Sequence, residues 1–346
     1  MANICVLGGG LVGRFVACSL EQRGHTIRLI DSMELHDIPS NIEVLKKRVE
    51  PSEIAPLVAG FEVVVNCLPG RIGHAVRKPL LAIDGMSVSD LAFTAEDPRD
   101  LDNFAKSNNS RLVYDVGIAP GLSNALLMHS QQKMAELQVA KIWVGGNPQQ
   151  PDEDWSYMAP FSPSDVIEEY TRPARFRRDY TDVTEPALSE RHIVHVPGYG
   201  EMEAFLTDGV RSLLDTIESR DLVEYTVRWP GHIQKYIDGN FSEKDLIEAW
   251  KFDENRPEFT WLRVLTSDGQ TEWMWDIIDE GKGGWSSMAR TTGLVTVEVA
   301  EMLSEGVFEE FGVMPAEYIG TDDSLLERVI QKMRLNGVRI SESKTS

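Results

Sequence analysis

The sequence contains no run of about 18 apolar residues, the length that a membrane-spanning helix requires. It also lacks a charged segment followed by an apolar one at its start, so we expect no signal peptide and a cytoplasmic protein. Cysteine is scarce: Cys5, Cys18 and Cys67 lie in apolar stretches and form no CxxC pair. They predict small core residues in a reducing compartment and argue against a disulfide framework.

Basic residues are fewer than acidic residues. The 34 Lys and Arg residues face 55 Asp and Glu residues, which gives a formal charge of -21. This balance repels phosphate backbones and acidic membranes and favours cationic ligands. We therefore expect no nucleic-acid partner and no membrane partner.

Residues 3–31 follow a strand, turn, helix, strand pattern. Asn3–Leu7 is an apolar run of strand length, and helical spacing of apolar residues then continues until Gly24. A second apolar strand, Thr26–Ile30, ends at Asp31. The turn between the first strand and the helix is glycine-rich.

Gly8, Gly10 and Gly13 fill the pattern G-x-G-x-x-G in that turn. In a dinucleotide-binding turn the first glycine permits the tight bend, the second lets backbone approach a pyrophosphate, and the third lets the helix pack closely. The helix N-terminus, with Leu11 and Val12, then faces the anion. The alternative is a tight strand–helix turn that binds nothing.

Asp31 follows Gly8 at close to the roughly 20-residue offset of the acid that binds a ribose diol. Neither Ser32 nor Met33 is a cation that could meet a 2′-phosphate. The sequence therefore favours NAD over NADP as the cofactor.

Strand and helix signals then alternate as far as residue 121. We expect helices at residues 52–58, 73–82 and 98–106, and strands at residues 62–66, 86–90 and 111–115. Such alternation is typical of a parallel, doubly wound sheet. Residues 1–121 are thus predicted to form an α/β, Rossmann-type NAD-binding domain.

In this architecture ligands bind outside the carboxyl ends of the strands. We expect two such segments to contact the cofactor, one with Cys67, Leu68 and Pro69 and the other with Asp90 and Leu91. Pro-Gly pairs are also ordinary turn formers. Asp90 could belong to the site or could cap the segment that follows it.

The pattern changes beyond residue 121, and all eight tryptophans lie there. Segments 259–266 and 271–278, joined through an Asp-Gly pair, predict an antiparallel hairpin. Val210, Leu213, Leu214 and Ile217 give the apolar face of a helix that Thr207 or Asp208 could cap. We predict an α+β substrate domain on a mixed or antiparallel sheet over residues 122–286.

The C-terminal part is predicted to be helical. We expect a helix at residues 294–303 and expect the helices of residues 287–346 to pack back onto the first domain. The terminal SESKTS is expected to be frayed.

Five segments that follow the glycine turn resemble the saccharopine dehydrogenase-like family of amino acid oxidoreductases. They read DVGIAPGLSN, YTRPARF, EMEAFLTDG, VRWPGH and MARTTG, at residues 115–124, 170–176, 201–209, 227–232 and 288–293. The short length and the GIAPGLSN and EAFLTDG segments look most like the NAD-dependent lysine 6-dehydrogenases. That resemblance implies oxidation of the ε-amino carbon of L-lysine to 2-aminoadipate 6-semialdehyde with release of ammonia, a step of lysine degradation.

Two departures separate the chain from the similar glutamate-forming saccharopine enzymes. The family loop has an acidic residue before Pro-Gly where this chain has Ala119. The saccharopine enzymes also carry a run that contains an arginine, and the matching residues here are Leu206, Thr207 and Asp208. A saccharopine dehydrogenase or a related imine or amine reductase is the alternative enzyme, and a non-catalytic dinucleotide sensor is a further alternative.

The chemistry needs a base, because an ε-ammonium of pKa about 10.4 must lose a proton before hydride leaves. Asp90, Glu201, Glu203 and His232 are the candidates. A lone histidine is more often an ordinary hydrogen-bonded residue, and Glu203 could face the surface. We give the catalytic role to Asp90, Glu203 and His232.

The substrate carboxylate needs a cation, and the best donor is an arginine whose fork makes two parallel hydrogen bonds. Arg172, Arg175 and Arg228 lie in the matching segments, although some of them could form surface ion pairs. We expect Tyr170, Arg172, Arg228, Thr207 and Ala119 to bind the small amino acid substrate.

Two further expectations concern metal and assembly. His192 and His195 are three apart in a strand-like run and would point to opposite faces, so we expect no metal site. A tryptophan-rich sheet face could form a two-fold interface, which favours a homodimer, although the same tryptophans could be core.

Overall fold

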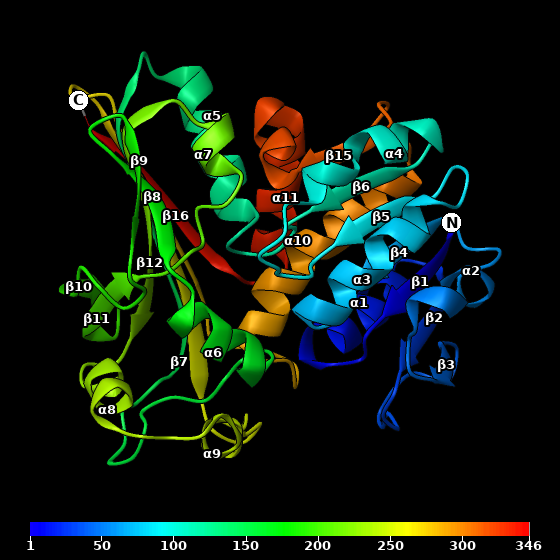
Figure 1. Ribbon diagram of the computed structural model, residues 1–346, viewed down its shortest axis with the longest axis horizontal. Helices are drawn as coiled ribbons and strands as arrows, with labels where there is room; N and C mark the ends of the chain where they lie inside the picture. The colour runs from blue at the N-terminus through cyan, green and yellow to red at the C-terminus, as the bar shows by residue number, and fades with distance from the viewer. Residues whose placement is uncertain (346) are drawn as a thin grey trace. The chain divides into compact units, whose positions relative to one another are not determined.

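Seven parallel strands form the first sheet of the computed structural model, which describes residues 1–345 (Figure 1). The sheet belongs to a unit made of residues 1–117 and 292–318. Its strand order is β15-β6-β5-β4-β1-β2-β3. The elements assigned to it are β1 (Asn3–Leu7), α1 (Leu11–Gln22), β2 (Thr26–Asp31), β3 (Glu43–Lys46), η1 (Pro51–Glu53), α2 (Ile54–Leu57), β4 (Val63–Asn66), α3 (Gly70–Leu81), β5 (Ser87–Asp90), η2 (Pro98–Leu101), α4 (Asp102–Ser107), β6 (Arg111–Tyr114), most of α10 (Ser287–Ser304), and β15 (Gly312–Pro315), which η3 (Ala316–Thr321) follows.

Helices cover both faces of this sheet. Apolar side chains of α2, α3 and α4 pack with those of the strands in one buried cluster that includes Leu57, Val76, Val88 and Ala105. On the other face α10 packs against α1, because Gly293 lies directly against Phe15. The predicted doubly wound domain is therefore confirmed, and β3 and β15 are strands that the sequence analysis missed.

The second unit contains residues 118–291 and 319–346 and is built on a nine-stranded mixed sheet. The main strand order is β10-β11-β12-β7-β13-β14-β16, with β8 and β9 attached to β12. Among the paired strands of residues 118–345, β7 and β12 are parallel and the other pairs are antiparallel. Its elements are α5 (Leu122–Lys133), β7 (Leu137–Pro148), α6 (Pro163–Thr171), β8 (Ala174–Arg178), β9 (Thr181–Glu185), β10 (His192–Val196), β11 (Gly200–Leu206), α7 (Leu213–Thr216), β12 (Ser219–Arg228), α8 (His232–Asp238), α9 (Glu243–Ala249), β13 (Glu258–Ser267), β14 (Glu272–Asp279), α11 (Asp323–Leu335) and β16 (Arg339–Thr345).

The predicted hairpin is confirmed by β13 and β14, which pair antiparallel across the Asp-Gly turn. The predicted helix around residues 210–217 is wrong in extent, since α7 has only four residues. Neither expected cap serves it: the Thr207 hydroxyl bonds Thr226, and Asp208 binds Arg175. The apolar residues Val210, Leu213 and Ile217 are buried without forming one continuous helix.

The C-terminal region differs from its prediction. Residues 292–318 belong to the first unit, but residues 319–346 belong to the second. SESKT is not frayed, because it belongs to β16, which pairs with β14 and is red in Figure 1. All residues of this edge strand except Ile340 are polar, so hydropathy did not reveal it.

The tryptophans are core residues. Seven of the eight are buried within the chain, and Trp285 is half-buried. An exposed tryptophan face, the reason given for a homodimer, is therefore absent from residues 1–345. Among these residues no helix combines the length and apolar character needed to cross a bilayer.

Candidate functional site

The glycine turn of the first unit has the backbone geometry that a dinucleotide needs. Gly8 has φ +95°, and a Cβ there would lie 2.6 Å from the Cys67 carbonyl oxygen. A Cβ on Gly13 would lie 1.9 Å from the Gly8 carbonyl oxygen, so only glycine lets α1 sit this close to β1. A Cβ on Gly10 would meet nothing within 4 Å. Backbone atoms therefore crowd the turn at Gly8 and Gly13, whereas the space next to the Gly10 Cα is empty.

The α1 N-terminus suits an anion. Gly10 is its N-cap residue and has no side chain, so the first N–H groups of α1, including those of Leu11 and Val12, receive no side-chain cap from it. These groups and the helix dipole favour a pyrophosphate. The residues present therefore fit a nicotinamide dinucleotide.

Asp31 lies at the end of β2 beside this turn. Its Oδ2 accepts a hydrogen bond from the Gly9 N–H at 2.6 Å, and its Oδ1 accepts one from the Met33 N–H at 2.7 Å. Each carboxylate oxygen can accept further hydrogen bonds, as binding of a ribose diol would require. Lys46 on β3 is the cross-strand neighbour of Asp31, and its ammonium lies 3.4 Å from Glu34. The sequence analysis missed this cation because it missed β3.

Cys67, Leu68, Pro69, Asp90 and Leu91 lie at the carboxyl ends of β4 and β5. These strands are neighbours of each other, and β4 is also the neighbour of β1, so the predicted cofactor segments share one edge of the sheet with the glycine turn. Burial raises the pKa of the Cys67 thiol to about 12, so the thiol stays protonated.

Asp90 forms a fully buried ion pair. Its Oδ2 accepts from Arg77 Nε at 2.6 Å, and both side chains have no exposed surface. Its Oδ1 accepts from the Ala92 N–H and from Asn66 Nδ2. Burial raises the pKa of the carboxyl, and the adjacent Arg77 guanidinium opposes that shift. All these contacts hold neighbouring loops together, which favours a structural role.

In the second unit, Arg228 is the centre of a buried polar cluster. The residue closes β12, and its Nε donates to the Tyr170 hydroxyl at 2.9 Å while the guanidinium lies 4.5 Å above the Tyr157 ring. Its side chain is 3% exposed. The structure thus joins two predicted residues, Tyr170 and Arg228, but encloses the arginine among aromatic rings.

His232 continues the hydrogen-bond chain from Tyr170. Its Nδ1 lies 3.0 Å from the Trp155 carbonyl oxygen, and its Nε2 lies 3.1 Å from the Tyr170 hydroxyl. A carbonyl can only accept, so Nδ1 carries the hydrogen and Nε2 accepts from Tyr170. Burial, with help from the Arg228 charge, lowers the pKa of His232 to about 3. The ring is therefore neutral at physiological pH.

This low pKa predicts how stability depends on pH. His232 has a pKa of about 6.5 in the unfolded chain and about 3 in the folded protein. Between these two pH values the unfolded chain therefore binds a proton that the folded protein does not. The free energy of unfolding is therefore highest above pH 6.5, and it falls by up to about 1.4 kcal/mol for each pH unit as the pH is lowered from 6.5 to about 3. Urea unfolding at several pH values should show a shallower dependence for His232→Gln than for the natural protein. Equal slopes would contradict the neutral buried ring.

Glu169 is a member of the cluster that the sequence analysis missed. It lies on α6 directly before Tyr170, and its Oε1 accepts from the Thr226 hydroxyl at 3.0 Å. Its Oε2 is buried, accepts no hydrogen bond from residues 1–345, and lies 3.9 Å from Arg228 Nη2. Burial raises the pKa of this carboxyl, and Arg228 and Thr226 oppose the shift. The Thr207 hydroxyl joins this cluster through a 2.8 Å hydrogen bond with the Thr226 hydroxyl.

Arg172 and Arg175 lie on either side of Asp208. Arg175 holds both carboxylate oxygens of Asp208, at 2.9 and 3.0 Å, and Arg172 Nη1 lies 3.8 Å from the same carboxylate. The Arg175 side chain is 44% exposed and that of Arg172 is 16% exposed. Arg175 is therefore committed to an ion pair with Asp208, whereas Arg172 is the less exposed of the two and makes the longer contact with the same carboxylate.

The remaining predicted residues lie apart from this chain of contacts. Glu203 is the cross-strand neighbour of Arg228, is buried rather than surface-facing, and accepts from Arg191 Nε at 2.7 Å. Glu201 is exposed, opposite His195 on β10. Ala119 lies in the loop before α5. Within the described chain no three His, Cys, Asp or Glu side chains gather as metal ligands would.

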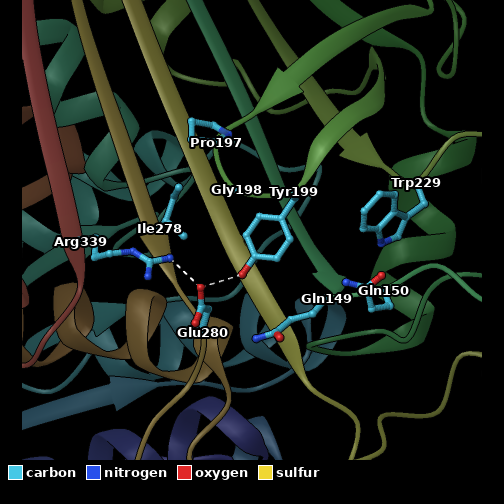
Figure 2. A pocket seen from close by; sticks show the side chains of 9 residues that line it. All are labelled: Gln149, Gln150, Pro197, Gly198, Tyr199, Trp229, Ile278, Glu280 and Arg339. Carbon is cyan, nitrogen blue, oxygen red and sulfur yellow. Dashed lines mark hydrogen bonds and ion pairs between the residues drawn. The ribbon is translucent and has the colours of Figure 1, made fainter.

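Figure 2 shows a cavity of about 530 Å³ in the second unit that contains none of the predicted site residues. Tyr199 and Arg339 both donate to one oxygen of Glu280, at 2.9 and 2.7 Å. Trp229 lines the cavity, whereas the preceding residue, Arg228, contacts Tyr170. The charges of this cavity are already paired with each other, so we place the candidate substrate site at the Arg228 cluster.

Part of the second unit is similar to a known protein family. Residues 117–242 match the family model described as the saccharopine dehydrogenase C-terminal domain. This segment contains the whole Arg228 cluster, from Tyr157 to His232. The match supports the family resemblance that the sequence motifs indicated.

The fold is that of a saccharopine dehydrogenase. The apo saccharopine dehydrogenase (L-Glu forming) from Saccharomyces cerevisiae has a TM-score of 0.75 and 14% identity over 100% of both chains. The DAP dehydrogenase of C. glutamicum in complex with DAP has a TM-score of 0.43 and 8% identity over 95% of this chain and 98% of that one. An engineered D-amino acid dehydrogenase bound to NADP+ has a TM-score of 0.45 and 9% identity over the same shares.

Proposed function

We propose that the protein is an NAD-dependent oxidoreductase that oxidises the ε-amino carbon of free L-lysine. The observation that carries the dinucleotide part is the glycine turn, which is open only in front of Gly10 and leads into the uncapped N-terminus of α1. The family match of the second unit supports an amino acid as the substrate.

The chain supplies binding groups for both reactants. The N–H groups of the first turn of α1 would hold the pyrophosphate, and Asp31 would hold a ribose diol. NAD, when bound, supplies a hydride acceptor. The ends of β4 and β5, from Cys67 to Pro69 and at Leu91, would border it. Arg172, which lies beside the cluster, would hold the substrate carboxylate.

The reaction balances with water as the second reactant. Lysine with a protonated ε-amine, NAD+ and water give the 6-semialdehyde, ammonium, NADH and one proton. The substrate amine must first lose a proton, and the imine that forms after hydride loss is then hydrolysed. Oxidation should rise toward alkaline pH, because the free ε-amine has a pKa of about 10.4. A net charge of -21 favours this cationic substrate.

A saccharopine dehydrogenase is the second candidate. The family match and the similarity to the yeast fold favour it. Ala119 and the Leu206-Thr207-Asp208 run favour lysine, because they omit an acid and an arginine that the saccharopine enzymes carry. A dinucleotide sensor without turnover is the third candidate.

The test is NADH formation with lysine, ornithine and saccharopine side by side, with ammonia assayed in parallel. We expect lysine to be oxidised fastest, with one ammonia released per NADH. Faster turnover of saccharopine, or lysine oxidation without ammonia, would promote the second candidate. Tight NAD binding without turnover of any amine would favour a sensor.

Asp31 should set the preference for NAD over NADP. A 2′-phosphate would meet the Asp31 carboxylate, whereas the nearby Lys46 is held by Glu34. We expect Asp31→Ser to narrow the preference at least tenfold, and adding Met33→Arg to narrow or reverse it. The measurement is the dissociation constant of each dinucleotide. Lys46→Ala in the Asp31→Ser background is the matched control, because it shows whether Lys46 then binds the phosphate; tighter binding of NADP by the natural protein would refute the Asp31 argument.

We also propose a homodimer, for a reason other than tryptophan exposure. Lys141, Leu265 and Met274 are cross-strand neighbours on β7, β13 and β14 and remain half-buried. Such a partly apolar sheet face is suited to a two-fold contact. Sedimentation across micromolar concentrations should give a dimer mass, and a monomer throughout would contradict it.

A further inference from the structure

We propose that Glu169 is the carboxylate that binds the substrate ammonium group and accepts its proton. This inference deepens the proposed function and rests on it. It assigns a role to a residue that lies next to the predicted Tyr170 and that no motif indicated.

The carboxylate of Glu169 has one oxygen held and one available. Thr226 donates to Oε1, and Thr226 is itself fixed by Thr207. Oε2 is buried yet accepts no hydrogen bond within residues 1–345. A buried carboxylate oxygen without a donor is costly, and an ammonium group would satisfy it with a strong, charge-assisted hydrogen bond.

Two other carboxylates near the cluster are each bonded to an arginine, although Glu203 Oε2, like Glu169 Oε2, accepts no hydrogen bond within residues 1–345. Glu203 accepts from Arg191 Nε at 2.7 Å, and Asp208 receives both arms of Arg175. Arg228 Nη2 lies 3.9 Å from Glu169 Oε2, and Arg228 Nε donates to the Tyr170 hydroxyl. The charges of Arg228 and Arg172 both act on the Glu169 carboxylate, but neither guanidinium donates a hydrogen bond to Oε2, which keeps its accepting capacity for a ligand.

The Glu169 side chain as a whole is partly exposed, although its Oε2 atom is buried. Its side chain is 18% exposed, whereas that of Arg228 is 3% exposed. Arg228 is thus a positioning residue that donates to Tyr170 and whose charge opposes the rise in the pKa of Glu169 that burial causes. Arg172 follows Glu169 by three residues, so one short segment carries a carboxylate that could bind an amine and a guanidinium that could bind a carboxylate. That pair of groups is suited to an amino acid with a second amine.

The proton transfer is simple to write. The Glu169 carboxylate takes one proton from the ε-ammonium and becomes a carboxylic acid, while the substrate becomes a neutral amine. Burial raises the pKa of Glu169, which makes the carboxylate a better proton acceptor than an exposed glutamate. The acid then returns the proton to water or to the departing ammonia.

The experiment compares Glu169→Gln with Glu168→Gln, a matched change one residue earlier on α6. Two readouts are needed: kcat/KM for lysine, and calorimetric binding of lysine and of norleucine to the NADH-loaded protein. Norleucine has the same carbon chain without the ε-amine. We expect Glu169→Gln to lower kcat/KM by about 10²- to 10⁴-fold and to abolish the preference for lysine over norleucine. Glu168→Gln should behave as the natural protein.

Each outcome bears on one proposal. If the natural protein oxidises lysine and Glu169→Gln keeps both its kcat/KM and its lysine preference, the role of Glu169 is refuted and the proposed function stands. If no amine is oxidised but Glu169→Gln still loses selective lysine binding, the proposed function fails and the ammonium site stands. An equal loss in Glu168→Gln would also refute the assignment. Should Glu169→Gln fail to bind NADH, Glu169→Asp, which keeps the charge, must retain lysine selectivity for the assignment to survive.

Discussion

Replacing Asp90 by Ala should lower the free energy of unfolding by about 3–5 kcal/mol, because it leaves a buried guanidinium without its partner. Arg77 would keep its bonds to the Thr94 hydroxyl and the Ala92 carbonyl but lose the carboxylate 2.6 Å away. Both side chains have no exposed surface, so water cannot replace the lost contact. Urea unfolding is the measurement.

A double substitution separates this structural role from a catalytic one. Arg77→Met combined with Asp90→Leu removes both charges, and such apolar replacement of a buried pair is often neutral or stabilising. The double variant should therefore recover most of the stability lost in Asp90→Ala. If Asp90→Ala folds with natural stability but loses oxidation of lysine, the catalytic role predicted from the sequence is restored.

Substituting Gly13 by Ala should disrupt the first unit. The new Cβ would meet the Gly8 carbonyl oxygen at 1.9 Å, and that atom belongs to backbone that cannot rotate away. We expect a loss of about 1–3 kcal/mol in stability, as overpacking usually costs, together with weaker NAD binding. Thermal unfolding and dinucleotide titration measure the two effects.

Gly10→Ala is the matched control for that change. A Cβ at Gly10 meets nothing within 4 Å, and its φ of -67° suits any residue. Stability should therefore stay within about 0.5 kcal/mol of the natural value. NAD affinity should still fall at least tenfold, because the methyl group would stand where the pyrophosphate approaches. Unchanged NAD affinity in Gly10→Ala would place the dinucleotide elsewhere.

Local sequence signals predicted the first unit well. The β1–α1–β2 segment carries its own information: apolar strands, helical spacing and glycines whose roles the structure shows individually. The Asp-Gly hairpin of β13 and β14 is equally local. These elements are fixed by residues close together in the chain, so a single sequence reveals them.

The missed elements are those with weak local signals. The residues of β3 are mostly exposed, and β15 has four residues and ends in proline. The almost wholly polar sequence of β16 resembles a frayed tail. Their positions depend on strands far away in the sequence. Lys46 went unnoticed beside Asp31 for the same reason.

The sequence predicted several residues of the candidate site but not the hydrogen bonds that join them. Tyr170, Arg228 and His232 do lie in one hydrogen-bond chain, yet the order of that chain is a tertiary fact. The start of α6 is signalled by Pro163 and Asp165, so the helix could have been predicted. The closeness of Glu169 to Thr226 on β12 could not, because it depends on how that helix packs.

The interleaved division of the chain has a consequence for dissecting the protein. The first unit needs residues 292–318 for β15 and for most of α10, and the second needs residues 319–346 for α11 and β16. A stop codon after Gly117 would therefore leave a sheet without its β15 edge strand. An isolated dinucleotide-binding module would instead require a gene that joins residue 117 to residue 292 through an engineered linker.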